Sequence, residues 1–126
     1  MMRVGNVQLR ILRELWQRGE ATVADIHAAL ARESGVALTT VATMLKKMEH
    51  KGIVAHRVEE RRHIYRTTVT EHDIRRSMVA DLTARLFDGD ATALVSHLLS
   101  EHDIDHEDVA EIRRLLTAWQ RKERRR

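Results

Sequence analysis

The sequence of 126 residues contains no cysteine and no proline, and only 3% of it is aromatic. Without cysteine the chain can form neither disulfides nor thiolate metal sites, which fits a reducing compartment. With so few aromatic side chains, the core must be aliphatic and small, and a second subunit would help to complete it. No apolar stretch is long enough for a signal peptide or a membrane span. We therefore expect a soluble cytoplasmic protein without membrane insertion.

Apolar residues make up 43% of the chain and charged residues 33%, which predicts a foldable and largely helical protein. The charges are unevenly distributed. Residues 1–66 carry 12 Lys or Arg against 7 Asp or Glu, whereas residues 67–126 carry 10 against 12. The basic excess of the first half favours a nucleic-acid partner for that half.

Three helical patterns fill the first 50 residues. The first ends at Arg18-Gly19, the second begins with a capping box of Thr22 and Asp25, and the third follows a turn at Ser34-Gly35. Short connections between three helices are typical of a helix-turn-helix unit. The apolar residues at helical spacing in the first two helices are Val7, Ile11, Leu12, Leu15, Trp16, Val23, Ile26 and Leu30.

The third helix, which we expect to begin at Thr39, has one apolar and one polar face. At about 3.6 residues per turn, Val41, Leu45 and Met48 stack on one side. The opposite side carries hydroxyl, ammonium and imidazole groups, which can contact phosphates and base edges in the major groove. A solvated surface helix would show the same pattern. The predicted DNA-facing residues are Thr39, Thr40, Thr43, Lys46, Lys47 and His50.

Two β-prone runs follow Gly52, a predicted helix stop. Residues 53–58 and 63–69 flank a charged segment at residues 59–62, which predicts a β-hairpin with a four-residue tip. Arg61 and Arg62 at this tip would meet backbone phosphates or the minor groove. A hairpin that only packs, without touching DNA, is the alternative. Three helices followed by a hairpin predict a winged helix-turn-helix.

Residues 70–126 are predicted to be wholly helical. Thr70 with Asp73 begins one helix, and Asp105 with Asp108 begins the last. Three short helices cannot bury their wide apolar faces alone, so we expect them to pair with the same helices of a second chain. The alternative is that they fold back on the first half. The predicted dimerisation residues are Leu82, Leu86, Leu94, Leu98, Ile112, Leu115, Leu116 and Trp119.

The sequence as a whole predicts a mainly α fold with a small β-hairpin wing. We expect residues 1–69 to form an N-terminal winged-helix DNA-binding domain. We expect residues 70–126 to form a C-terminal helical dimerisation domain of three helices.

The order of these motifs resembles the penicillinase-repressor family, the β-lactam-resistance and copper-responsive repressors of bacteria. The resemblance covers nearly the whole chain. It is carried by the third helix at residues 39–48, by the segment at residues 51–54, by Tyr65, and by residues 86–89 followed by residues 93–95.

The resemblance implies a homodimeric repressor that binds an inverted-repeat operator in double-stranded DNA, with the polar face of the third helix at the bases. In the β-lactam branch, a membrane sensor peptidase leads to cleavage between an Asn and a Phe, where this chain has His97 and Leu98. In the copper branch, a C-terminal cysteine cluster binds the metal, and this chain has no cysteine. Its wing tip also lacks the glycine common in relatives.

Eight histidines raise the alternative of a histidine-based metal-sensing regulator. Nitrogen and oxygen ligands such as these can hold zinc. However, their spacing fits no compact motif, and acidic residues at a helix start are explained by capping and the helix dipole. We predict no metal site and no cofactor. The residues considered are His97, His102, Asp103, Asp105, His106, Glu107 and Asp108.

The sequence contains no glycine-rich phosphate loop, no nucleophile elbow and no HExxH pattern. We therefore predict a DNA-binding protein and not an enzyme. A winged helix that serves as a protein-interaction module is the remaining alternative, and it would be indifferent to DNA.

Overall fold

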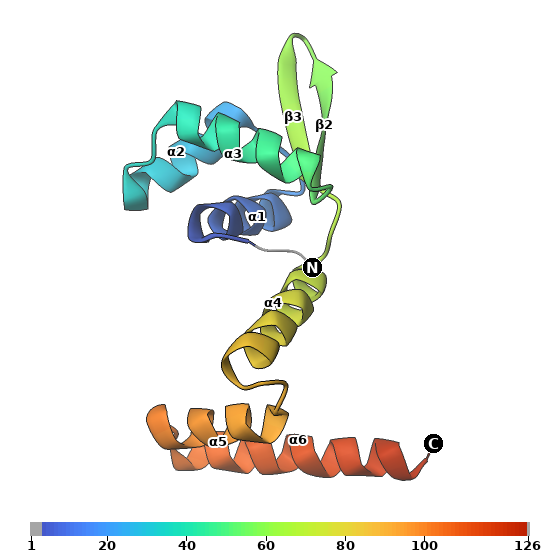
Figure 1. Cartoon of the computed structure of the whole chain (residues 1–126). Helices are drawn as coiled ribbons and strands as arrows, with labels where there is room; N and C mark the ends of the chain where they lie inside the picture. Colours follow the sequence, from blue (N-terminus) through green and yellow to red (C-terminus); the bar gives the residue numbers. More distant parts are fainter. Residues whose placement is uncertain (1–3, 126) are drawn as a thin grey trace. The chain divides into compact units, whose positions relative to one another are not determined.

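The computed structural model describes residues 4–125 (Figure 1). By their contacts, the residues form two compact units, one up to Leu82 and one from Thr83 onward. The elements in chain order are α1 (Asn6–Arg18), β1 (Ala21–Thr22), α2 (Val23–Ser34), α3 (Leu38–His50), β2 (Val54–Glu59), β3 (Arg62–Thr67), α4 (Glu71–Leu86), α5 (Ala91–Glu101) and α6 (His106–Arg124).

The helix boundaries of the first unit follow the predicted signals. Helix α1 ends at Gly19, whose φ of 85° favours glycine. The Asp25 amide donates to Thr22 Oγ1 at 3.1 Å, and the Thr22 amide donates to Asp25 Oδ2 at 3.2 Å, so the capping box of α2 is confirmed. Gly35 ends α2 in the left-handed conformation with a φ of 62°.

The sheet has three antiparallel strands in the order β1-β3-β2. Strand β1 was not predicted, because two residues are too short to show an alternating pattern. The four-residue tip was also wrong: Glu59 pairs with Arg62, so only Glu60 and Arg61 form the turn. Their φ values of 50° and 67° match a two-residue turn of the kind that continues the twist of the strands.

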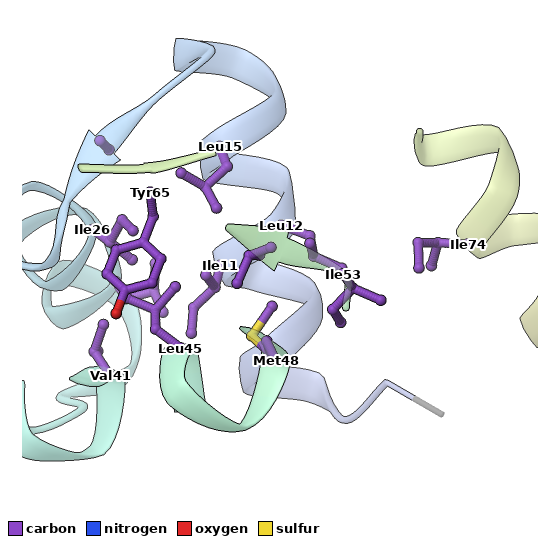
Figure 2. Packing of buried hydrophobic residues seen from close by; sticks show 13 residues of the cluster. Ile11, Leu12, Leu15, Ile26, Val41, Leu45, Met48, Ile53, Tyr65 and Ile74 are labelled. Carbon is purple, nitrogen blue, oxygen red and sulfur yellow. The ribbon is translucent and has the colours of Figure 1, made fainter. Parts of the chain in front are cut away.

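The core of the first unit joins helices α1, α2 and α3 to the sheet. Figure 2 shows Ile11, Leu12 and Leu15 of α1 with side chains of α2, α3 and the strands. Ile74 of α4 also belongs to this cluster and is only 1% exposed. Trp16 Nε1 donates to the Val69 carbonyl oxygen at 3.0 Å, which ties α1 to the segment before α4. Helix α4 therefore begins in the winged-helix unit.

The second unit contains the end of α4 and helices α5 and α6. Asp90 accepts a hydrogen bond from the Ala93 amide at 3.1 Å, and Asp105 accepts one from the Asp108 amide at 2.9 Å, so both helices have side-chain N-caps. No residue of α5 or α6 is buried within the described chain. Among the described residues, no helix combines the length and the apolarity that a bilayer span requires.

Candidate nucleic-acid interface

Helix α3 presents the polar face that its sequence predicts. Val41, Leu45 and Met48 are fully buried against the core. On the other side, Thr40 is half-buried and the remaining predicted contacts are exposed, which leaves hydroxyl and ammonium groups free for a polyanion. The exposed predicted contacts are Thr39, Thr43, Lys46, Lys47 and His50.

The start of α3 has no side-chain cap. The helix begins at Leu38, one residue earlier than predicted, and its N-cap residue is Ala37. The first amides of a helix have no acceptor within that helix, and they can bind a phosphate oxygen. The N-terminal end of α3 is therefore suited to a backbone phosphate.

A shallow hollow lies beside this end of α3. It is lined by the three threonines of the polar face and by Met44. Gln8 Nε2 lies 3.6 Å from Met44 Sδ, and Gln8 Oε1 accepts from the Gly5 amide at 3.3 Å. Gln8 of α1 thus contacts one lining residue of the hollow, while Thr39 and Thr43 remain exposed beside it.

The wing is joined to the rest of the first unit by two side-chain contacts. Glu49 of α3 contacts His56 of β2, with Nδ1 2.8 Å from Oε2. Arg57, the next residue of β2, binds Glu20 in the segment between α1 and β1 and also binds Glu59 of its own strand. The hydrogen bond from Arg57 lowers the pKa of the Glu20 carboxyl, so the pair stays charged at neutral pH. The first contact joins the hairpin to α3, and the second joins it to the segment between α1 and β1.

Sequence reasoning missed Glu49, His56 and His63. The rings of His56 and His63 stack with centroids 4.5 Å apart and planes 10° apart. Tyr65 lies beside both rings, and burial, followed by the charge of Glu49, raises the pKa of its hydroxyl. Strand alternation places the three ring residues on one face once the register is known. The register itself was not visible in the sequence.

The two predicted tip arginines are exposed but differ in position. Arg61 lies in the turn, and Arg62 is the first residue of β3. By alternation, Arg62 shares a face of the hairpin with Ile64 and Arg66, opposite the ring residues. The structure therefore does not place both arginines at the tip.

The predicted dimerisation residues lie on α4, α5 and α6 with much of their apolar surface uncovered. Leu94 and Ile112 are half-buried, and the other six are exposed, among them Leu86 at 71% and Trp119 at 60%. Five of these exposed apolar side chains belong to the second unit, which begins at Thr83, and so many are unusual for a monomeric unit of this size.

The histidines of the second unit do not converge. Across the described residues, no three His, Cys, Asp or Glu side chains come close enough together to hold a metal ion. His97 instead contacts the ring of Phe87 edge-on, with centroids 5.9 Å apart.

Comparison with known proteins agrees with this geometry. A family model described as penicillinase repressor matches residues 4–118. Transcriptional regulator BlaI of Mycobacterium tuberculosis is 28% identical over 110 residues, which cover 86% of this chain and 80% of that protein. The penicillinase repressor of Bacillus licheniformis is 20% identical over 113 residues, which cover 90% and 88% of the two chains.

Solved structures show the same fold. The crystal structure of YusO from Bacillus subtilis matches with a TM-score of 0.53 and 21% identity, covering 94% of this chain and 75% of that chain. The solution structure of the DNA-binding domain of the repressor BlaI matches with a TM-score of 0.52 and 22% identity, covering 56% and 87%. The predicted mainly α winged-helix fold is confirmed, and the chain belongs to the penicillinase repressor family, whose members are transcriptional repressors and not enzymes.

Proposed function

We propose that the protein is a homodimeric repressor that binds an inverted-repeat operator in double-stranded DNA through α3 and the wing. The observation that carries this proposal is the polar face of α3. That face is exposed except at the half-buried Thr40, while Val41, Leu45 and Met48 fix the opposite face in the core. A helix held in this way can enter a major groove without rearrangement.

The side chains of α3 suggest a division of roles. Lys46 and Lys47 are exposed in the C-terminal half of the helix and would contact phosphates, which supplies affinity for any sequence. Thr43 lies one turn closer to the N-terminus beside the shallow hollow, where a hydroxyl or methyl group can reach a base edge. Thr39, Thr40 and His50 would contact the DNA on either side of this centre.

The exposed apolar face of α4, α5 and α6 would be covered by the same face of a second chain. A two-fold axis through such an interface would give two winged helices related by that axis, which matches an inverted repeat. In this proposal residues 1–69 bind DNA and residues 70–126 pair the chains. The chain would act in the cytoplasm, where its operator is accessible.

The proposal includes release of the operator by proteolysis between His97 and Leu98, after a signal from a membrane sensor peptidase. Both residues are exposed, and they lie inside α5. A protease binds its substrate as an extended chain, so α5 must unwind locally, which requires that few contacts hold it. The test is mass spectrometry of the protein after co-expression with such a peptidase. Fragments of residues 1–97 and 98–126 are expected, and an intact chain would remove this step.

The DNA interface is tested by equilibrium binding to a duplex from upstream of the protein's own gene and to a scrambled duplex, across a salt series. Lys46→Ala and Lys47→Ala are expected to weaken binding to both duplexes and to reduce the salt slope by about one each. Lys122→Ala in α6 is the matched control and should leave the slope unchanged. Unchanged slopes in both α3 variants would contradict the phosphate assignment.

Sequence reading by α3 is tested by Thr43→Ala in the same assay. If Thr43 contacts a base, the variant should lose about 1–3 kcal/mol on the native duplex and little on the scrambled one. Thr117→Ala, whose hydroxyl donates to the Arg113 carbonyl oxygen in α6, is the matched control. Equal losses on both duplexes would give Thr43 a positioning role. Weak and equal binding of the unmodified protein to both duplexes would favour a protein-interaction module.

A further inference from the structure

Three side chains connect the DNA-facing helix to the outer half of the wing. Glu49, at the end of α3, contacts Nδ1 of His56 in β2, and the two side chains form an ion pair when that ring is protonated. The ring of His56 in turn stacks on that of His63 of β3, at a centroid separation of 4.5 Å. A continuous series of side-chain contacts therefore links α3 to His63, which is exposed to solvent.

The strand register shows which way His63 faces. His56 pairs with Tyr65, and Val58 pairs with His63, so these side chains share one face of the hairpin. Tyr65 is buried in the core, and His56 reaches Glu49 of α3, so this is the face turned toward α3. In Figure 1 the hairpin rises beside the C-terminal end of α3. His63 thus lies beyond His56 on the side where DNA bound to α3 would lie.

The charged groups around the rings of His56 and His63 determine how many protons the two rings can bind together. His56 faces Glu49 from α3 and faces His63 and Tyr65 from β3. A cationic His56 is compensated by the Glu49 carboxylate. A second cation on a ring stacked at 4.5 Å would be repelled by the first and needs an anion of its own. Among the contacts of the described residues, His63 has no carboxylate partner.

We propose that a DNA phosphate supplies this second anion, so that His63 is a phosphate contact that takes up one proton from solvent when the protein binds DNA. Glu49 and His56 are positioning residues, because Glu49 contacts the His56 ring on which the His63 ring stacks. This inference rests on the proposed function in DNA binding. It adds a contact that the predicted tip arginines do not provide, since Arg62 lies on the opposite face of the hairpin.

Proton uptake makes operator affinity depend on pH. Because the bound state holds more protons than the free state, the association constant rises as pH falls. Histidine changes charge between about pH 5 and pH 8, so the rise is expected in that range. The limit for one proton is tenfold per pH unit for each wing. At low pH the salt slope should also gain about one for each wing, because one more cation meets a phosphate.

The test is operator binding by the full chain from pH 6 to pH 8 at constant ionic strength, with calorimetry in two buffers of different ionisation enthalpy to count the protons taken up. His63→Gln cannot be protonated, and its position is exposed, so the variant should fold. We expect it to lose most of the pH dependence and the extra salt slope at pH 6, so that its affinity differs from that of the unmodified protein more at pH 6 than at pH 8. His102→Gln, an exposed histidine of the second unit, should change neither.

Two further variants separate this contact from its neighbours. His50→Gln removes the titrating group predicted to face DNA on α3, and it should leave the pH dependence assigned to His63 in place. His56→Gln removes the stack and the ion pair, and it should reduce proton uptake as far as His63→Gln does, with no further loss in the double variant. Undiminished uptake in His56→Gln would overturn the positioning role.

The outcomes for the two proposals are distinct. If the unmodified protein prefers its operator but His63→Gln takes up as many protons, His63 is not the contact and only this inference is overturned. If the unmodified protein shows no preference for its operator at any pH, the proposed function is overturned and this inference with it.

Discussion

At the scale of single residues, the turn of the wing carries the clearest local strain. Glu60 and Arg61 both have positive φ, which costs a residue other than glycine about 1 kcal/mol or more. The double variant Glu60→Asn, Arg61→Gly has the pair preferred in such turns. We expect its free energy of unfolding to rise by about 1 kcal/mol, measured by urea denaturation of the full chain.

The control for that prediction is Arg66→Gly, the same kind of change inside β3. No positive φ is relieved there, and glycine in a strand should lower the free energy of unfolding by about 0.5–1 kcal/mol. A double turn variant that is less stable than the unmodified protein would show that the turn does not have this conformation.

The predictions for single residues were correct where the periodicity of one helix decides which side chains are buried. The buried face of α3 follows from helical periodicity alone, so Val41, Leu45 and Met48 could be predicted. The ion pair of Glu49 with His56 could not, because it depends on how β2 packs beside the end of α3. The same applies to the stack of His56 with His63, which requires the hairpin register.

At the scale of elements, two helices begin with the same capping box. In α2 and α4, the threonine amide and hydroxyl each form a hydrogen bond that lowers the pKa of the partner carboxyl, Asp25 or Asp73. Because the folded pKa lies below the unfolded value, the stabilisation is present above the ordinary pKa of about 4 and is lost as pH falls through the folded pKa.

This linkage predicts a weaker acid dependence when the carboxylates are removed. Asp25→Asn together with Asp73→Asn should lower stability at neutral pH and flatten its loss between about pH 5 and pH 3. Urea denaturation at several pH values measures this. Asp103→Asn, which removes a carboxylate from the connection between α5 and α6, is the control. An unchanged acid profile in the double variant would show that the caps are not linked to stability.

The elements themselves were largely predictable, since glycines and capping boxes mark the helix ends. Strand β1 was missed because it exists only by pairing with β3, at Ala21 with Tyr65 and Thr22 with Ile64. The site of Ile74 was also unexpected. The sequence pattern predicts that Ile74 lies on an apolar face of its helix. It does not predict that Ile74 packs in the core of the first unit.

At the scale of the whole molecule, the exposed apolar face of the second unit predicts a dimer that controls DNA affinity. Leu115→Ala with Trp119→Ala should shift the chain toward the monomer in sedimentation experiments. Operator affinity should fall with it, because two linked winged helices bind one inverted repeat more tightly than one does. The folding of α3 should not change, because the variants lie in the other unit.

Thr117→Ala with Arg121→Ala is the matched double control, since helical spacing places both residues on the side of α6 away from Leu116. It should remain a dimer with unchanged operator affinity. A stable dimer in the Leu115 and Trp119 variant would place the interface elsewhere. The organisation of the whole molecule was the least predictable feature. The spacing of apolar residues in one chain shows neither that the units divide after Leu82 nor which surface would cover α6.

The two tryptophans of the chain lie one in each compact unit. Trp16 is half-buried and bound to Val69, whereas Trp119 is 60% exposed. The protein therefore carries a built-in fluorophore for each half. In a Trp16→Phe variant, the emission of Trp119 should move to shorter wavelength as chains associate. In a Trp119→Phe variant, the emission of Trp16 should follow the melting of the first unit alone, so pairing and unfolding can be recorded separately without a label.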